Sequence, residues 1–148
     1  LFFLSLFMIF IIMKLILKNS NKLFDTTQNG VVKEFVKFIR KQLPLQKDTT
    51  VTFLEKRDHS MTTGVRRPNS EIFVLTSKRL LIDVLRTLAH EWVHEYQHQK
   101  MGLNDDQPIQ DIGGKVENMA NALGGIMVKK FEKEFPKHED ALYGEHES

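Results

Sequence analysis

The chain contains no cysteine among its 148 residues. Disulfide bonds and cysteine-ligated zinc sites are therefore excluded, and any bound metal must be held by histidine, aspartate or glutamate. An excess of charge of one sign is also lacking, because 21 basic and 19 acidic residues leave a net charge of +2. Without a dense cluster of lysine and arginine, the composition does not predict a nucleic-acid partner.

No apolar run reaches the roughly 20 residues that a membrane-spanning helix needs. Residues 1–12 are apolar apart from Ser5, but Lys14 interrupts the run. They also lack the basic start and the small-residue cleavage site of a secretory signal. We expect residues 1–12 to be a leader or translated upstream sequence ahead of a start at Met13, and the protein to be cytoplasmic. A membrane anchor formed by residues 1–17 is the alternative.

The rest of the sequence predicts one α+β domain over residues 13–136, followed by a charged, frayed tail over residues 137–148. Short β-branched or apolar runs indicate strands, at 14–18, 50–54 and 71–76. Apolar residues at helical spacing indicate helices, at 26–43, 79–100 and 115–135. The segment 59–70 is predicted to be turn-rich. We expect a small antiparallel or mixed sheet packed on the central helix, with the last helix beside it.

The central predicted helix carries the most informative motif. His90, Glu91 and His94 match the H-E-x-x-H pattern of zinc metallopeptidases. Residues four apart on an α-helix lie about one turn apart on one face, so the two imidazoles can converge on one zinc ion. Glu91 lies about 100° round the helix, where a general base for an attacking water belongs. The apolar stripe of this helix lies roughly opposite the histidines, at Leu81, Leu85, Leu88 and Trp92.

The motif matches again one turn later, at His94, Glu95 and His98. A single metal ion cannot use both matches, because His90 and His98 are about 12 Å apart along the helix. Glu95 falls on the apolar stripe, which suits a catalytic base poorly. We therefore predict His90 and His94 as metal ligands and Glu91 as the base, with His98 as a supporting residue.

A catalytic zinc ion usually has three protein ligands and an open position for water. Glu117 is the predicted third ligand, because it opens the last predicted helix at the edge of that helix's apolar stripe. Gly124 and Gly125 would let the two helices approach closely. Asn121, one turn after Glu117, is predicted to support the ligands, as is Tyr96. Alternative third ligands lie on the intervening loop, at Asp105, Asp106 and Asp111.

The pattern A-H-E-x-x-H at 89–94, followed by E-x-x-A-N at 117–121, resembles the gluzincin pattern of ImmA/IrrE-type metallopeptidases. It is also similar to small uncharacterised H-E-x-x-H proteins encoded in tailed-phage genomes. The resemblance covers residues 61–130, and its H-E-x-x-H part alone is shared by many unrelated families. It implies a minimal zincin-like domain with a strand, here 71–76, beside the active-site helix. It also implies that His90, His94 and Glu117 are Zn²⁺ ligands and that Glu91 is the catalytic base.

These features predict a zinc metalloendopeptidase that hydrolyses a peptide or protein substrate, in a host cytoplasm or virion if the chain is phage-encoded. An extended substrate is expected to pair with the strand at 71–76. Four side chains are considered for stabilising the oxyanion: Tyr96, Tyr143, His138 and Arg67. The alternative function is a non-catalytic, zinc-stabilised interaction module, for example a phage virion or host-binding component. Such a module needs the metal ligands but does not need Glu91.

Overall fold

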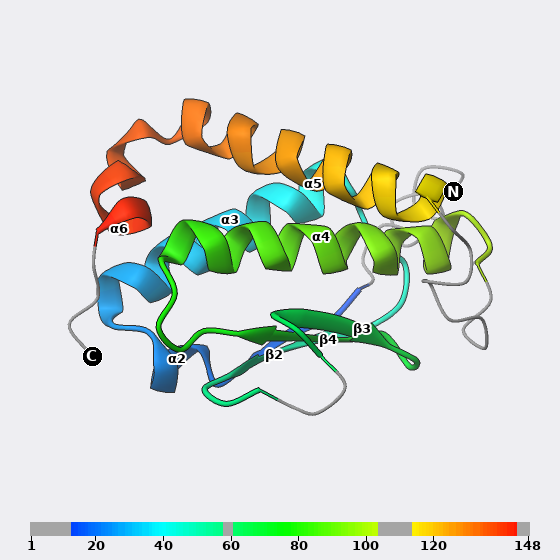
Figure 1. The fold of residues 1–148 in the computed structure, drawn as a ribbon, viewed down its shortest axis with the longest axis horizontal. Helices are drawn as coiled ribbons and strands as arrows, with labels where there is room; N and C mark the ends of the chain where they lie inside the picture. The colour runs from blue at the N-terminus through cyan, green and yellow to red at the C-terminus, as the bar shows by residue number, and fades with distance from the viewer. Residues whose placement is uncertain (1–12, 58–60, 104–113, 145–148) are drawn as a thin grey trace, which may run out of the picture.

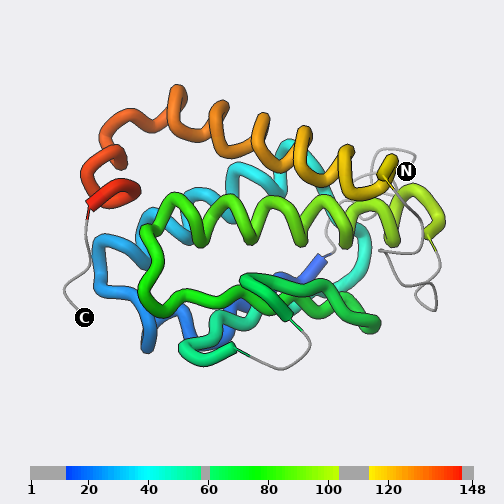
Figure 2. Tube along the Cα trace, in the orientation of Figure 1, coloured from blue at the N-terminus to red at the C-terminus, as the bar shows by residue number. Residues whose placement is uncertain are grey.

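The computed structural model describes residues 13–57, 61–103 and 114–144. In chain order the elements are β1 (Leu15–Lys18), α2 (Ser20–Leu23), α3 (Thr26–Gln42), β2 (Thr49–Leu54), β3 (Gly64–Arg67), β4 (Glu71–Leu75), α4 (Leu81–Lys100), α5 (Gly114–Glu134), η2 (Pro136–His138) and α6 (Glu139–Tyr143). Helix α4 lies between the sheet and α5 (Figure 1). Figure 2 shows α4 and α5 running side by side along most of their length. The protein is a single small α+β domain, which confirms the predicted fold class.

The sheet has four strands in the order β1-β2-β4-β3. Strands β1, β2 and β4 are parallel to one another, and β3 pairs antiparallel with β4. Side chains of β2 alternate between buried and half-buried positions, so Val51 and Phe53 point into the core. The sheet is therefore mixed, and β3 is an edge strand that pairs only with β4 among the described residues.

Local sequence signals determine the ends of α3. The Asp25 carboxylate accepts a hydrogen bond from the Gln28 N–H at 2.8 Å, and Gln28 Oε1 accepts one from the Asp25 N–H at 3.1 Å. The helix ends before Pro44, which has no N–H to continue it. The carbonyl of Leu43 then accepts a hydrogen bond from the Trp92 indole at 2.9 Å, which joins the end of α3 to α4.

The apolar stripe predicted on α4 forms the centre of the core. Its four members are each 0% exposed: Leu81, Leu85, Leu88 and Trp92. Burying one such side chain contributes about 1.5–3 kcal/mol. The stripe therefore fixes the rotation of α4 about its own axis, and with it the direction of the opposite face that carries the histidines.

Strand β3 is a correction to the turn-rich segment predicted at 59–70. It pairs Gly64 with Val74 and Arg67 with Glu71. The short run Gly-Val-Arg-Arg has no clear alternation of apolar and polar residues, so its pairing with β4 makes it a strand. The Arg66 side chain is only 4% exposed, because the strand carries it against α4.

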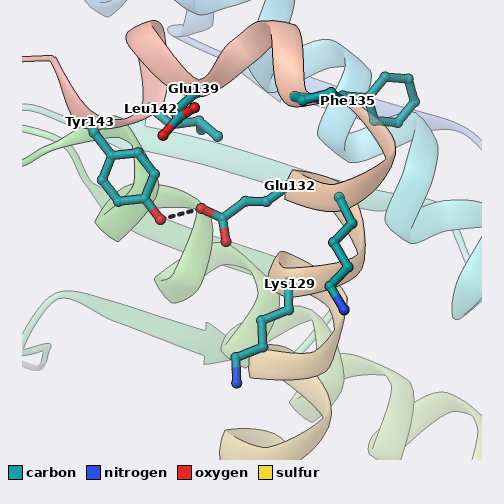
Figure 3. Close-up of a pocket in the computed structure, with 8 residues that line it drawn as sticks. Lys129, Glu132, Phe135, Glu139, Leu142 and Tyr143 are labelled. Atoms are coloured by element: carbon teal, nitrogen blue, oxygen red, sulfur yellow. Dashed lines mark hydrogen bonds between the residues drawn. The ribbon is translucent and has the colours of Figure 1, made fainter.

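The C-terminal segment also differs from the frayed tail predicted at 137–148. Residues up to Tyr143 form η2 and α6, and Leu142 is 1% exposed within the core. Tyr143 faces Glu132 of α5 and donates a hydrogen bond to it (Figure 3). Most residues around Leu142 in the sequence are charged or polar, so the sequence gives little indication that this residue is buried. The domain therefore extends beyond residue 136, at least to Tyr143.

At the other end of the chain, Met13 is 8% exposed and its carbonyl accepts a hydrogen bond from Arg40. The fold therefore includes Met13. Residues 1–12, predicted to be a leader, lie outside the described residues, as do the loop residues 104–113 with their three alternative aspartate ligands. In the part of the chain that the structure describes, no helix is both long enough and apolar enough to span a membrane.

Candidate metal centre

Three potential ligand side chains meet between α4 and α5. His90 and His94 project from α4, and Glu117 projects from the first turn of α5. The Nε2 atoms of the two histidines are 3.1 Å apart. Glu117 Oε1 lies 3.0 Å from His94 Nε2, and Glu117 Oε2 lies 3.4 Å from His90 Nε2. The structure thus brings together the three residues that the sequence predicts as ligands.

The separations between these atoms fit a metal ion. Ligand atoms bound to a tetrahedral zinc ion at about 2.0–2.1 Å lie about 3.3–3.4 Å from one another. Imidazole nitrogens and a carboxylate oxygen are also ordinary zinc ligands. The side chains of His94, His90 and Glu117 are 2%, 24% and 43% exposed. The site is therefore buried on the His94 side and open to solvent on the Glu117 side, which leaves access for water and a substrate.

Gln97 determines which nitrogen of His94 faces this centre. Its Nε2 donates to the Val116 carbonyl at 3.1 Å, so its Oε1 is the atom that lies 2.8 Å from His94 Nδ1. Because Oε1 can only accept, Nδ1 carries a proton, and a neutral His94 keeps its lone pair on Nε2. That lone pair faces a carboxylate oxygen of Glu117, an arrangement that needs a cation or a proton between them.

Gln97 is not among the predicted site residues, although it is 2% exposed and joins the centre to α5. Its position three residues after His94 places the two side chains on one face of the helix. That spacing was the signal available in the sequence. The bond to Val116 also fixes the backbone immediately before Glu117, so one buried amide side chain orients a ligand on each helix.

Gly124 permits the close approach of α5 to α4. A Cβ atom at this position would lie 3.2 Å from the His90 backbone nitrogen and 3.4 Å from the Ala89 carbonyl carbon. At Gly125 a Cβ atom would meet nothing within 4 Å. The predicted role therefore falls to Gly124 alone, because Gly125 faces away from α4.

His90 is held in place by Asn121 as well as by Glu117. Burial lowers the pKa of the His90 imidazole, and the charge of His94 lowers it further. The Glu117 carboxylate and a hydrogen bond with Asn121 act in the opposite direction. The net lowering favours the neutral imidazole, which is the form that binds metal.

Glu91 lies on the neighbouring face of α4, against β3. It is 9% exposed, and burial raises the pKa of its carboxyl to about 8, with the charge of Glu117 adding to the rise. The Arg66 peptide N–H donates to the carboxylate and lowers this pKa without cancelling the effect of burial. A carboxyl group with a pKa near neutrality, close to the candidate ligands, suits proton transfer.

The second match to the motif is not assembled. Glu95 is 0% exposed and its Oε1 lies 2.7 Å from Arg66 Nε, so its carboxylate is neutralised by a buried guanidinium. His98 Nδ1 lies 3.2 Å from the Leu103 carbonyl oxygen. His98 also lines a cavity of about 530 Å³ that none of the three candidate ligands lines. Tyr96, predicted to support the ligands, packs against the hydrophobic core.

Two side chains considered for the oxyanion lie at the far end of α5. Tyr143 binds Glu132, which is roughly 22 Å along the helix from Glu117. His138 Nε2 lies 2.7 Å from Glu34 Oε1 of α3. Arg67 places its guanidinium carbon 4.9 Å from the centre of the Phe73 ring. Tyr143 and His138 are thus too far from the candidate ligands to reach a substrate bound there.

Comparison of the chain with protein-family models, curated proteins and solved structures finds no match. The case for a function therefore rests on the chemistry of the site itself.

Proposed function

We propose that the protein is a zinc-dependent metalloendopeptidase whose metal ligands are His90, His94 and Glu117. The convergence of two imidazole Nε2 atoms and a carboxylate within 3.0–3.4 Å of one another carries this proposal. The hydrogen bond from His94 Nδ1 to Gln97 strengthens it, because it turns an unprotonated nitrogen towards the carboxylate. The resemblance to gluzincins of the ImmA/IrrE type remains part of the proposal.

The side chains divide the chemistry between them. A zinc ion held by the three ligands supplies a Lewis acid that polarises a peptide carbonyl and acidifies water. Glu91 accepts the proton of the attacking water and delivers it to the leaving amine. A pKa of about 8 in the absence of metal lets this carboxyl both take up and release a proton near neutral pH. A nearby divalent cation shifts it towards the carboxylate form that a base requires.

The proposed substrate lies along β3 rather than along the strand predicted at 71–76. Both edges of β4 are occupied, by β2 and by β3. Leu75 N–H donates to the Thr63 carbonyl, and bonded pairs alternate along an antiparallel ladder, so the peptide groups of Gly64 and Arg66 point away from β4. The Arg66 N–H is bonded to Glu91, so the proposed substrate strand takes its backbone hydrogen bond from Gly64. An extended peptide that adds to this edge by β-augmentation is held beside Glu91.

A non-catalytic, zinc-stabilised interaction module is the second candidate function. The observation in its favour is that Tyr143 and His138 are bound at the opposite end of α5. An interaction module would keep zinc and the fold without requiring a charged base at position 91.

Metal analysis and a single substitution test the proposal. Elemental analysis of the purified protein should find about one zinc per chain. Hydrolysis of an unfolded protein substrate should stop on chelation and return when zinc is added. Glu91→Gln keeps nearly the same volume and should keep zinc, but the rate should fall by about 10²–10⁴-fold because the general base is lost.

The matched control is Glu132→Gln, which makes the same chemical change at the far end of α5. It should retain both zinc and full activity. If wild type and Glu91→Gln cleave the substrate equally, or if neither cleaves anything while both bind zinc, the interaction module replaces the peptidase. Absence of zinc from the wild-type protein would contradict both.

A further inference from the structure

Helix α4 and the edge strand β3 are joined by a polar stripe that is separate from the metal ligands. Thr87, Glu91 and Glu95 are spaced four apart on α4 and lie on one face. A Cβ atom at Gly64 would lie 2.4 Å from Thr87 Cγ2 and 3.2 Å from Glu91 Cγ, so β3 passes directly over this face. Arg66 of β3 binds the other two residues of the stripe. Its peptide N–H donates a hydrogen bond to Glu91, and its side-chain Nε donates one to Glu95.

The Glu95 carboxylate has a full set of donors. Its Oε1 accepts from Arg66 Nε at 2.7 Å, and its Oε2 accepts from Ser70 Oγ at 2.9 Å and from Gln99 Nε2 at 2.6 Å. Gln99 is itself held, because its Oε1 accepts from the N–H groups of Gln46 and Lys47 at 2.7 and 2.9 Å. The Glu95 carboxylate therefore connects α4 to β3 through Arg66 and to the start of β4 through Ser70, the residue just before that strand.

Stability alone does not account for this ion pair. The side chains of Glu95 and Arg66 are 0% and 4% exposed, so both charges have lost most of their hydration. Replacing such a pair with well-packed apolar residues is often neutral or stabilising. What the pair supplies is a defined geometry, since a carboxylate with three donors holds the Arg66 backbone in one position relative to α4.

We propose that Glu95, through Arg66, is a positioning residue that holds the Arg66 peptide N–H against Glu91 and so fixes the general base beside the metal ligands. This inference rests on the proposed function, because it assigns Glu91 a catalytic role. The glutamates of the two overlapping motifs then have different roles. Glu91, in the first match, is the proposed base, and Glu95, in the second match, orients it through Arg66. Gln97, on the face of α4 that packs against α5, orients His94 independently of this stripe.

The first measurement needs no activity. In Glu95→Gln one carboxylate oxygen becomes an NH₂ group, which can only donate. Whichever oxygen it replaces, it faces a donor N–H of Arg66 or of Gln99, so the bonds that hold Arg66 are broken or rearranged. Amide exchange followed by NMR should then show the Arg66 N–H exchanging about tenfold faster or more. Zinc affinity should stay within about threefold, because the change leaves all three ligands in place. Unchanged protection of the Arg66 amide overturns the proposal.

The second measurement is a double-mutant cycle on turnover. A displacement of about 1 Å at a catalytic group can cost about 10²-fold, so kcat should fall by about that factor in Glu95→Gln. If Glu95 acts through Glu91, then adding Glu95→Gln to Glu91→Gln should cost little more. Additive losses would mean that Glu95 acts only on the fold, and would refute a positioning role.

Two further variants control for folding. Arg66→Lys keeps the positive charge facing Glu95. It should retain more activity than Glu95→Gln does, and the amide hydrogen at position 66 should exchange more slowly than in Glu95→Gln. Ile39→Val, in the buried part of α3, lowers stability without touching this stripe and should leave kcat unchanged. If Glu95→Gln does not fold, Arg66→Lys and Arg66→Gln carry the same comparison. If wild type shows no hydrolysis, the peptidase fails, whereas the exchange result still decides whether Glu95 positions β3 on Glu91.

Discussion

The crossing of α4 and α5 at Gly124 offers a sharp test of how the candidate centre is built. The chain provides its own control, because Gly125 is the adjacent residue of the same helix and both are interior positions. Replacing glycine with alanine inside a helix stabilises it by about 0.8–1.0 kcal/mol through helix propensity alone. The two substitutions therefore share this gain and differ only in what the new methyl group meets.

At Gly125 the methyl group meets nothing within 4 Å, so Gly125→Ala should stabilise the protein by about 1 kcal/mol. At Gly124 the methyl group would lie 3.2 Å from the His90 backbone nitrogen and 3.4 Å from two further backbone atoms. Backbone atoms cannot rotate aside as a side chain can, so overpacking should cost about 1–3 kcal/mol. Gly124→Ala should therefore be neutral or destabilised by up to about 2 kcal/mol.

The same substitution should weaken zinc binding. Glu117 lies two helical turns, about 10 Å, before Gly124 on α5, so pushing α5 away at the crossing also moves this carboxylate away from His90. A loss of about tenfold in zinc affinity corresponds to only about 1.4 kcal/mol. Urea unfolding of the metal-free proteins and competition with a chromogenic chelator measure the two effects separately. Equal stability gains and equal zinc affinities in the two variants would refute the role given to Gly124.

Four further predictions follow from the geometry. His90→Ala should abolish zinc binding in a calorimetric titration and His98→Ala should retain it; the reverse would select the second match to the motif, which shares His94 but not His90. Gln97→Leu should weaken zinc binding by about 10–100-fold with unchanged helix content by circular dichroism, because nothing then orients His94. In metal-free protein Glu91 has a pKa of about 8 instead of 4.5, so between these values the unfolded chain binds fewer protons and stability falls as pH rises. The fall should be on the order of 5 kcal/mol by urea unfolding and should be much smaller in Glu91→Gln. Leu142→Ala should destabilise the protein by about 2–5 kcal/mol in the same assay, whereas no effect would restore the predicted tail.

Much of the fold was predictable because its signals are local. Apolar residues at helical spacing identified the three long helices, and their ends differ from the predicted ones by no more than two residues. The three parallel strands β1, β2 and β4 are apolar or rich in β-branched residues, so they were predicted as well. Strand β3 was missed because its four residues have no strand pattern of their own and depend on pairing with β4. Helix α6 was missed because a single apolar residue, Leu142, anchors it.

The candidate site divides in the same way. Helical spacing alone placed His90 and His94 on one face opposite the apolar stripe, because 3.6 residues per turn leave no other choice once the helix forms. Glu117 was a prediction from the sequence, but only the packing of α5 on α4 at Gly124 brings its carboxylate to the histidines.

The sequence by itself determined the three long helices, the apolar face of α4 and the pair of histidines, since these depend on residues close together in the chain. Tertiary structure alone decided the roles of Gln97, Arg66 and Glu95. Gln97 orients His94 only because Val116 lies across the helix interface. Arg66 is a buried partner of Glu95 because β3 crosses over α4. Such contacts join residues 19 and 29 positions apart, and no local pattern encodes a distance in space between them.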